Sequence, residues 1–314
     1  MDSSDYRESL TERLNEVSMV AMSKPKILIQ LDTDSKPSVF DAVVAIDSGI
    51  DYLLQYANVR PDEVRALVHG AMYTRGPGDL KNTAIFIGGS NVTDGEAVAA
   101  SAAATLFDPF RVSIMLDSNG ANSTAAAAVL CAARHIELEN ATALVMAATG
   151  AVGQRVCQIL AKSNCNVIVA SRSLERSQEC IDKIAASRIP VHRMRPIAST
   201  DPSRLAIALE SSQLAFGCGA AGVSLLTAKQ LEQAKHLKVA IDLNAVPPAG
   251  FEGIGIMDKA IQRGNRSDYG ALGVGGLKMK IHKASIAALF DSNTHFLDCQ
   301  EMLEIGKRIL SLQT

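Results

Sequence analysis

The sequence predicts an α/β protein of two domains. Short apolar runs of strand length alternate with longer amphipathic runs of helix length, a pattern typical of strands and helices that alternate around largely parallel sheets. The length of 314 residues exceeds one typical domain and suits two. Hydrophobic residues make up 47% of the chain and charged residues 20%, so each domain can bury a proper core.

The elements are expected in a regular order along the chain. Strands are predicted where four to six mostly apolar, often β-branched residues stand between turn-forming ones: 26–31, 83–88, 111–116, 142–147, 166–171, 214–217 and 238–243. Helices are predicted where apolar residues recur every three or four positions: 94–106, 122–135, 151–163, 174–186 and 277–291.

A charged segment at 134–141 separates an Ala-rich helix from a new strand and marks a domain boundary. A Gly- and Pro-rich segment at 246–258 then leads the chain out of the second domain. The two domains are expected to enclose a cleft, where small ligands usually bind. The predicted division is an N-terminal extension (1–25), a substrate-binding α/β domain (26–135), a nucleotide-binding domain (136–245) and a return segment with C-terminal helices that pack on the first domain (246–314).

Composition excludes several classes of function. A net charge of −2 without a long basic run argues against a nucleic-acid partner. The N-terminus has no apolar signal-peptide core, so no signal peptide is expected. Leu10, Leu14 and Val17 form an apolar stripe at helical spacing there. Glycines interrupt the longest uncharged stretch of the chain, which argues against a membrane span. The six cysteines show no C-x-x-C pair and are expected to be reduced and packed as small hydrophobes, so a cytoplasmic protein is predicted.

A glycine turn between the strand at 142–147 and the next helix predicts a dinucleotide site. Its pattern is Ala148-x-Gly150-x-x-Gly153, a G-x-G-x-x-G fingerprint with alanine in the first position. Gly150 would let the backbone approach a pyrophosphate held by the free N–H groups of the helix start, and Gly153 would allow close packing of helix on strand. Thr149, Gly150, Val152 and Gly153 are therefore candidate cofactor contacts in a central Rossmann-type domain.

The end of the next strand selects the nucleotide. An enzyme that prefers NAD would carry an acidic residue there for the ribose hydroxyls, whereas this chain has Ser171, Arg172 and Ser173. A guanidinium and two hydroxyls suit a 2′-phosphate, so NADP is predicted, with NAD possible but weaker. Asn244, after the strand at 238–243, is a further candidate for the cofactor.

Polar loops follow two strands of the first domain, where ligands of open α/β sheets bind. In the first loop, Ser38 and Asp41 are expected to form a capping box. The other polar residues have no such duty and are expected to face the cleft: Asp32, Thr33, Asp34 and Lys36. In the second loop, Ser123 or Thr124 is expected to cap the next helix. The remaining polar residues there are candidate substrate contacts: Asp117, Ser118, Asn119 and Asn122. The pattern Asp32-x-Asp34 lacks further ligands, so no metal is expected.

The segment 269–283, YGALGVGGLKMKIHK, places four glycines just before a predicted helix. Lys278, Lys280 and Lys283 would crowd the first turns of that helix, where the dipole disfavours cations. Such a misfit points to a ligand near these lysines. The alternative is that the lysines are solvated beside a hinge.

Together, several long segments resemble the NAD(P)-dependent methylene-tetrahydromethanopterin dehydrogenases of bacterial one-carbon metabolism. The resemblance runs in order from about Lys26 to Phe290, and its weakest part lies between about 188 and 236. The segments are QLDTDSKPSVFDAVVAIDSGID, YTRG, TAIFIGG, PFRVSIMLDSNGANSTAAAA, TGAVGQR and GALGVGGLKMKIHKASIAALF. Ala148 departs from the family's usual glycine, and DLNAVPP stands where a variant with Tyr is expected.

The resemblance implies a reaction in formaldehyde metabolism: oxidation of 5,10-methylene-tetrahydromethanopterin to the 5,10-methenyl form by hydride transfer to NADP. It also implies a homo-oligomer, a trimer or hexamer, and assigns the family's active-site lysine to Lys278. Two other functions stay open at this point. One is a methylene-tetrahydrofolate dehydrogenase with the same chemistry, and the other is a non-catalytic protein that senses NADP.

Overall fold

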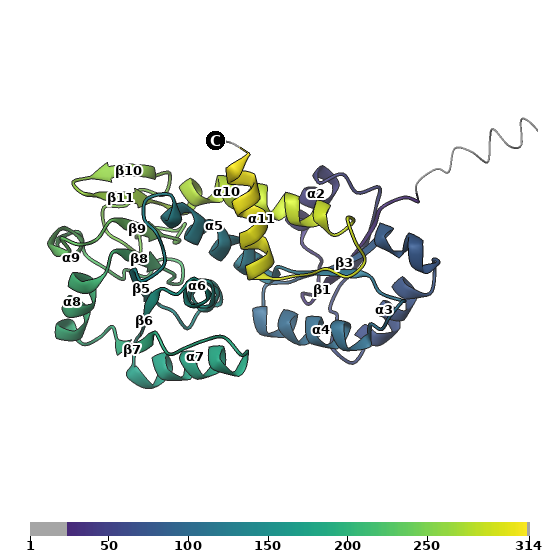
Figure 1. Ribbon diagram of the computed structural model, residues 1–314, viewed down its shortest axis with the longest axis horizontal. Coiled ribbons are helices and arrows are strands. Elements are labelled where there is room, and N and C mark those ends of the chain that lie inside the picture. Colours follow the sequence, from purple (N-terminus) through teal and green to yellow (C-terminus); the bar gives the residue numbers. More distant parts are fainter. Residues whose placement is uncertain (1–23, 313–314) are drawn as a thin grey trace, which may run out of the picture.

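The computed structural model describes residues 24–312, which fold into two α/β lobes, each built on its own sheet (Figure 1). One sheet has five strands in the order β12-β4-β3-β1-β2, and the other has seven in the order β10-β11-β9-β8-β5-β6-β7. The predicted two-domain α/β fold is confirmed. The apolar stripe predicted at Leu10, Leu14 and Val17 lies outside the described residues.

The five-stranded sheet forms the first lobe, and all of its strand pairs are parallel. Its strands are β1 (Ile27–Asp32), β2 (Tyr52–Tyr56), β3 (Thr83–Gly88), β4 (Ser113–Leu116) and β12 (Phe296–Leu297). Its helices are α2 (Val39–Asp47), α3 (Val64–Met72) and α4 (Val92–Thr105), with 3-10 turns η1 (Pro77–Asn82) and η2 (Ser118–Gly120). Every residue of the inner strand β3 is buried, which explains its unbroken apolar sequence.

The seven-stranded sheet forms the second lobe and has Rossmann topology. Read from β7 inward, the order β7-β6-β5-β8-β9 places the first strand of the unit in the middle, as in dinucleotide-binding domains. The strands are β5 (Thr142–Met146), β6 (Asn166–Ser171), β7 (Met194–Ala198), β8 (Leu214–Gly217), β9 (Val239–Asp242), β10 (Lys259–Arg263) and β11 (Arg266–Tyr269). The helices are α6 (Ala151–Lys162), α7 (Leu174–Ala186), α8 (Pro202–Ser211) and α9 (Ala228–Gln233).

Three helices join the lobes: α5 (Ala121–Ala133), α10 (Ala271–Ala288) and α11 (Cys299–Ser311) lie between the two sheets (Figure 1). Most of α5 is buried on all sides, and its alanines let α6, α10 and α11 pack closely against it. A Cβ at Gly306 of α11 would collide with the side chain of Leu130. Small residues therefore set the distance between the helices that hold the lobes together.

Two sequence expectations about the C-terminal third are wrong. The sheet of the second lobe takes β10 and β11 from residues 259–269, so the chain leaves this lobe later than residue 246. The helix expected at 277–291 begins at Ala271, because Gly270 and Gly273 are contact points, and nothing lies within 4 Å of a Cβ at Gly275 or Gly276. A Cβ at Gly270 or Gly273 would collide with backbone atoms of residues 255–259.

The predicted state of the cysteines is confirmed for the described residues. All six are free; Cys218 is half-buried and the others are buried. Burial raises the pKa of the Cys131 thiol to about 11 and that of Cys165 to about 12, so both are inert, protonated packing groups. Between residues 24 and 312, no helix is both long and apolar enough to cross a membrane.

Candidate active site

A pocket of about 350 Å³ opens at the carboxyl ends of the first lobe's strands, where α10 crosses them. Of the residues predicted to bind substrate, Asp34 and Asn119 line it, and so does Lys278. The full lining is Asp34, Ser38, Phe40, Asp41, Gly89, Ser90, Asn119, Gly120, Thr124 and Lys278.

Lys278 enters the pocket from the middle of α10. Its Nζ lies 4.8 Å from the centroid of the Phe40 ring, within cation–π range. A Cβ at Gly120 would lie 3.2 Å from both the Cε and the Nζ of Lys278, so glycine leaves room for the ammonium. Within residues 24–312 this ammonium has no ion pair. It is a half-buried cation with a cation–π contact and without an ion pair.

The lysines predicted to crowd the first turns of this helix do not lie there, although Lys278 does lie in the pocket. Because α10 begins at Ala271, the lysines are in its middle and not in its first turns. Lys280 is exposed, and Lys283 forms an ion pair with Asp47 at 2.8 Å. Only Lys278 of the three lines the pocket.

Asp41 supplies the opposite charge in this pocket and was not predicted as a site residue. Only half of the expected capping box forms: the Ser38 hydroxyl accepts from the Asp41 N–H, but the Ser38 N–H donates to Asp32 instead. Burial raises the pKa of the Asp41 carboxyl above its ordinary value, although the nearby charges of His282 and Lys278 act to lower it. Such a raised pKa is typical of a functional carboxyl.

Beneath the pocket, His282 and Asp117 form a fully buried pair. The His282 Nδ1 lies 2.7 Å from an Asp117 carboxylate oxygen, and the imidazole edge packs on the Phe86 ring. The His282 Nε2 is buried without a hydrogen-bond partner among the described residues. Burial favours the neutral carboxyl, yet the hydrogen bond and charge of His282 and a hydrogen bond from Ser123 bring the pKa of Asp117 below its usual value. No local sequence signal marks this pair, because the partners are 165 residues apart.

The first polar loop is tied down by Asp32, contrary to the expectation that this residue is free to face the cleft. Asp32 is fully buried and accepts hydrogen bonds from the backbone N–H groups of Asp34 and Ser38, both at 2.9 Å, and from the Gln30 side chain. Asp34 accepts from the backbone and hydroxyl of Ser90 and still lines the pocket. The Thr33 hydroxyl is buried against Gly89 and has no partner among the described residues.

The second polar loop is also mostly structural. Asp117 caps α5 by accepting from the N–H groups of Asn122 and Ser123, so neither Ser123 nor Thr124 caps this helix as expected. Ser118 donates to the Gly88 carbonyl, and Asn122 donates to the Leu116 carbonyl. Of the four predicted substrate contacts here, only the exposed Asn119 reaches the pocket. Its positive φ of 54° turns the loop toward the cleft.

The glycine turn of the second lobe leads into a helix whose N-terminus has no side-chain cap. Gly150 is the N-cap of this helix, α6. A Cβ at Gly150 would make only ordinary contacts, 3.5 Å from the Ala147 carbonyl oxygen and 3.6 Å from that of Cys218, whereas a Cβ at Gly153 would lie 2.8 Å from the Ala148 Cα. The predicted close packing at Gly153 is confirmed. The positive φ falls on Ala147, at 53°, and Ala148 takes an ordinary conformation as expected.

The other predicted cofactor residues differ in how free they are. Arg172 is exposed directly beyond β6, with no ion pair in the described part of the chain, whereas Ser171 is buried and the Ser173 hydroxyl caps α7. The Asn244 side chain is occupied within its own loop, donating to the Pro248 carbonyl and accepting from the Val246 N–H. Arg172 is therefore the available cation at this strand end.

A cleft of about 400 Å³ joins the two halves of the site. Thr149, Ala151 and Gln154 of the glycine turn line it from one lobe, and Ser90 to Thr93 line it from the other. Ser90 also lines the Lys278 pocket, so this cleft, which Thr149 of the glycine turn lines, adjoins that pocket.

An interlobe ion pair spans this cleft. Arg155 of α6 lies 2.7 Å from Glu96 of α4, and its Nε donates to Asn122 at 2.7 Å. Lys183 lies 3.5 Å from the other carboxylate oxygen of Glu96. The predicted substrate contact Asn122 is thus a link between the lobes.

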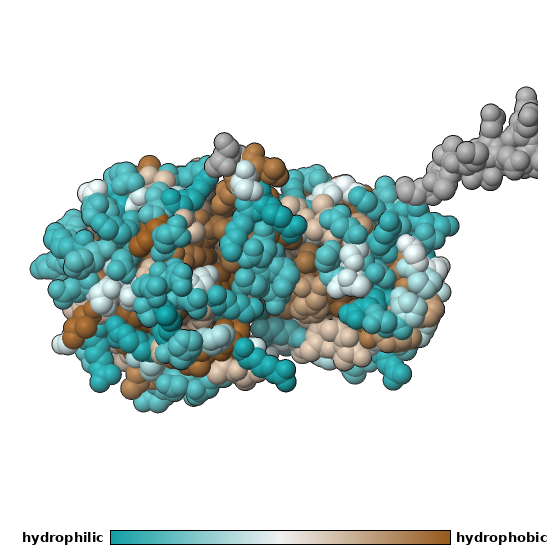
Figure 2. All heavy atoms as spheres, viewed as in Figure 1, coloured by the Kyte–Doolittle hydropathy of each residue, from teal (hydrophilic) through white to brown (hydrophobic). Residues whose placement is uncertain are grey.

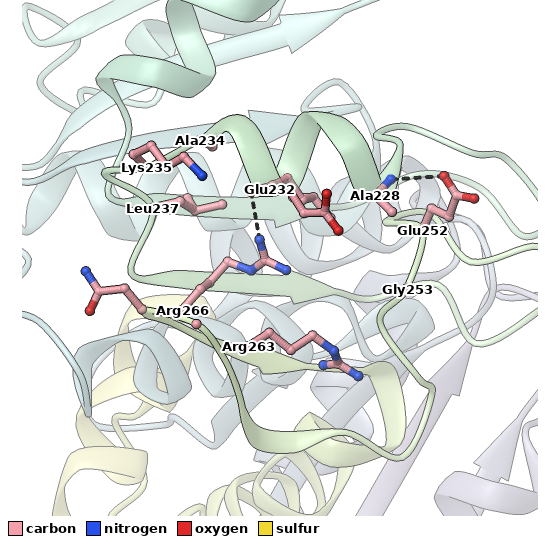
Figure 3. Close-up of a pocket in the computed structure, with 12 residues that line it drawn as sticks. Ala228, Glu232, Ala234, Lys235, Leu237, Glu252, Gly253, Arg263 and Arg266 are labelled. Carbon is pink, nitrogen blue, oxygen red and sulfur yellow. Dashed lines mark hydrogen bonds between the residues drawn. The ribbon is translucent and has the colours of Figure 1, made fainter.

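Elsewhere, a pocket of about 660 Å³ lies at the outer edge of the second sheet, between α9 and the β10–β11 hairpin (Figure 3). Its two guanidinium groups are already engaged, because Arg266 pairs with Asp268 and donates to the Leu231 carbonyl, while Arg263 pairs with Asp258 and Asp268.

Across residues 24–312, no three His, Cys, Asp or Glu side chains lie close enough together to hold a metal ion. The face in Figure 2 is largely hydrophilic, with apolar atoms gathered in the middle beside the linking helices.

Comparison with known proteins identifies the family. The family model described as "Methylene-tetrahydromethanopterin dehydrogenase, N-terminal" matches residues 39–119. The chain is 31% identical over 252 residues to an NAD(P)-dependent methylenetetrahydromethanopterin dehydrogenase of Methylorubrum extorquens, covering 77% of this chain and 84% of that protein. This chain belongs to the methylene-tetrahydromethanopterin dehydrogenase family.

A second relative in the same organism, the "Bifunctional protein MdtA", is 40% identical over 290 residues, covering 92% of this chain and all of that protein. Among solved structures, a shikimate 5-dehydrogenase from Listeria monocytogenes is 13% identical with a TM-score of 0.49, over 91% of this chain and 96% of that one. The segment matched by the methylene-tetrahydromethanopterin dehydrogenase model contains Phe40, Asp41, Ser90 and Asn119, so it spans much of the pocket wall.

Proposed function

We propose that this protein oxidises 5,10-methylene-tetrahydromethanopterin to the 5,10-methenyl form with NADP as hydride acceptor. The observation that carries this proposal is that the two half-sites adjoin. An uncapped helix start behind Gly150 and a pocket with opposite charges at Lys278 and Asp41 border one cleft. Membership of the methylene-tetrahydromethanopterin dehydrogenase family supports the choice of substrate.

The chemistry asks little of the protein beyond positioning. The carbon that loses hydride lies between two nitrogens, whose lone pairs stabilise the resulting cation, so no strong general base is needed. When bound, the nicotinamide supplies the hydride-accepting carbon. The residues of the site have to hold the methylene carbon of the pterin next to the nicotinamide ring and exclude water. Holding two reacting rings in one orientation accounts for a large part of the rate enhancement in such reactions.

Lys278 and Asp41 are suited to orient the pterin. An ammonium donates hydrogen bonds to the carbonyl and ring nitrogens of a pterin, and a carboxylate accepts from its amino and N–H groups. The negative charge of Asp41 also favours the cationic methenyl product, because fixed charges in a site of low polarity act strongly on developing charge. Phe40 offers an apolar face beside Lys278 for the ring.

The residues of the second lobe fit NADP. The uncapped N-terminus of α6 suits the pyrophosphate, and the unpaired Arg172 at the end of β6 suits a 2′-phosphate. We assign Gly150 and Arg172 to these two groups, with Thr149 and Val152 beside them. The protein is proposed to work in the cytoplasm, as a homo-oligomer.

Steady-state turnover tests the proposal. NADPH formation is followed with methylene-tetrahydromethanopterin and with methylene-tetrahydrofolate, each with NADP and with NAD. Higher kcat/KM for the methanopterin substrate with NADP supports the proposal. If only methylene-tetrahydrofolate is oxidised, the substrate is methylene-tetrahydrofolate and the proposed substrate is wrong. If NADPH binds but neither substrate is oxidised, the protein is the non-catalytic NADP sensor.

A further inference from the structure

A fully buried histidine lies beneath the Lys278 pocket, and the proposed reaction gives it no role. His282 follows Lys278 by four positions on α10, so the two side chains project from one face of this helix. Lys278 reaches the pocket, whereas His282 lies deeper, with its imidazole edge on the Phe86 ring. Buried polar atoms normally have hydrogen-bond partners, because an unsatisfied one is costly. A buried imidazole is therefore informative about the groups around it.

The fold satisfies one nitrogen of this ring and not the other. The Nδ1 of His282 lies 2.7 Å from one oxygen of Asp117, whose other oxygen accepts the backbone N–H groups of Asn122 and Ser123 at 2.9 and 3.0 Å. An ionised carboxylate only accepts hydrogen bonds, so the Nδ1 carries a proton. The Nε2 is buried without a partner in the described part of the chain. Asp117 thus holds the ring in place and leaves its second nitrogen to another group.

The carboxyl group of Asp41 lies close to this ring. A Cβ at Gly88 would lie 3.2 Å from an edge atom of the Phe86 ring and 3.4 Å from one carboxylate oxygen each of Asp32 and Asp41. The ring on which His282 packs is therefore next to the Asp41 side chain, and α10 packs against the helix α2 that carries it. Of the charges near Asp41, that of His282 acts most strongly to lower its pKa against the effect of burial.

The charges beneath the pocket balance only if the imidazole is positive. Three carboxyl groups face this region from different elements: Asp32 at the end of β1, Asp41 on α2 and Asp117 after β4. Within residues 24–312, none of them forms an ion pair with lysine or arginine. The ammonium of Lys278 is the cation on the pocket side. Like charges this close disfavour ionisation unless a further cation lies among them, and His282 can provide it.

We infer that His282 is a positioning residue for the proposed hydride transfer: its protonated imidazole, held by Asp117, keeps Asp41 ionised beside the substrate. The inference rests on the proposed function, in which the negative charge of Asp41 favours the cationic methenyl product. One imidazolium donates from both nitrogens, so it can bind a structural carboxylate and still present positive charge to a second one. His282 acts through Asp41 and does not touch the substrate.

The pH profile of kcat/KM tests this role, because it reports groups that titrate in the free enzyme. His282→Asn removes the positive charge and keeps an N–H donor for Asp117. We expect the pKa of the acidic limb to rise by about one unit, so that kcat/KM falls roughly tenfold below this limb and less above it. Lys283→Gln is the matched control, since it removes a neighbouring cation that pairs with Asp47 outside the pocket. Its profile stays that of the wild type.

A loss of the same size at every pH indicates a structural role of His282 and overturns the inference. The double variant adds a second criterion. In a protein that already carries Asp41→Asn, His282→Asn is expected to leave the shape of the profile unchanged. A shifted limb in that background also overturns the inference, because the charge of His282 then acts on a group other than Asp41.

Histidine titration in the ligand-free protein keeps the inference testable if His282→Asn does not fold or if no substrate is oxidised. The side-chain nitrogens of the six histidines are followed by NMR in the wild type and in Asp41→Asn. Coupling between two charges is mutual, so Asp41→Asn is expected to move the titration of one histidine to lower pH by about one unit. Identical titration curves in both proteins overturn the inference. A shifted curve without turnover of any substrate contradicts the proposed function and leaves the charge coupling of His282 and Asp41 established.

Discussion

Replacing Lys278 with methionine separates a role in catalysis from a role in the fold. Methionine keeps the length and flexibility of the side chain and removes its charge. Because Lys278 has no ion pair in the described residues, the fold loses its cation–π contact with Phe40, worth about 0.5–1 kcal/mol, and the attraction of its charge for the Asp41 and Asp117 carboxylates. A buried lysine that neutralised a structural carboxylate would instead cost about 3–5 kcal/mol on removal.

The substitution is expected to reduce kcat/KM by more, in free energy, than it reduces the free energy of unfolding. A charge-assisted hydrogen bond to the substrate is worth about 1.5–3 kcal/mol, which corresponds to a fall in kcat/KM of roughly 10- to 150-fold. Urea unfolding gives the stability of the variant, and initial rates of NADPH formation give its kcat/KM. Lys280→Met is the matched control, since Lys280 lies on the same helix but is exposed outside the pocket.

Either of two results contradicts a role of Lys278 in catalysis and not in the fold. A wild-type kcat/KM in Lys278→Met removes this side chain from the substrate site. A loss of stability near 3 kcal/mol, accompanied by a proportionate loss of folded protein at assay temperature, shows that the ammonium supports the fold.

Three further outcomes are expected. Arg172→Ala raises the KM for NADP roughly 10- to 150-fold and leaves that for NAD unchanged in steady-state kinetics; equal effects on both exclude contact with the 2′-phosphate. Gly153→Ala lowers the free energy of unfolding by about 1–3 kcal/mol, because its Cβ would press on backbone atoms. Gly150→Ala leaves the free energy of unfolding unchanged and weakens NADPH binding in a fluorescence titration. The reverse pattern contradicts the assigned roles. Asp41→Asn increases the free energy of unfolding in urea at pH 7. Because the pKa of Asp41 is raised in the folded state, its ionised form lowers stability at pH values above the ordinary carboxyl pKa, and the gain from Asn disappears as the pH falls below that value. An equal gain at pH 7 and below the ordinary carboxyl pKa contradicts this cause.

The inner strands could be predicted from the sequence and the edge strands could not. The strands β3, β6 and β8 lie at the predicted residues because buried parallel strands have continuous apolar sequences. The strands β2, β7, β10, β11 and β12 were not predicted. They lie at or near sheet edges, where solvent admits Arg195 and Lys259 into the sequence, and in β11 the ion pair of Arg266 with the buried Asp268 interrupts the apolar pattern. Helices α2, α3, α8, α9 and α11 were also not assigned.

The location of the site was predictable, but the division of labour among its polar residues was not. Loops at the carboxyl ends of parallel strands were expected to face the cleft, and Asp34 and Asn119 do so, while Lys278 reaches the same pocket from α10. Asp32 and Asp117 look equally free in the sequence, yet their carboxylates are used to hold backbone N–H groups. Sequence spacing cannot distinguish these roles, because the competing donors belong to the folded loops.

Asp41 and His282 show the converse limit. Asp41 fits a local capping pattern, which concealed its place in the pocket, and His282 meets Asp117 only after α10 crosses the first sheet. The long-range packing of α10 on the strand ends creates both the pocket and its charge balance.

The most direct test of the central claim is to follow the transferred hydrogen itself. Methylene-tetrahydromethanopterin carrying deuterium on the methylene carbon is oxidised by the enzyme with NADP, and the NADPH is analysed by mass spectrometry. The proposed reaction predicts one deuterium in the reduced nicotinamide of the product. NADPH formed without deuterium, or no NADPH formed at all while the cofactor binds, contradicts hydride transfer in this cleft.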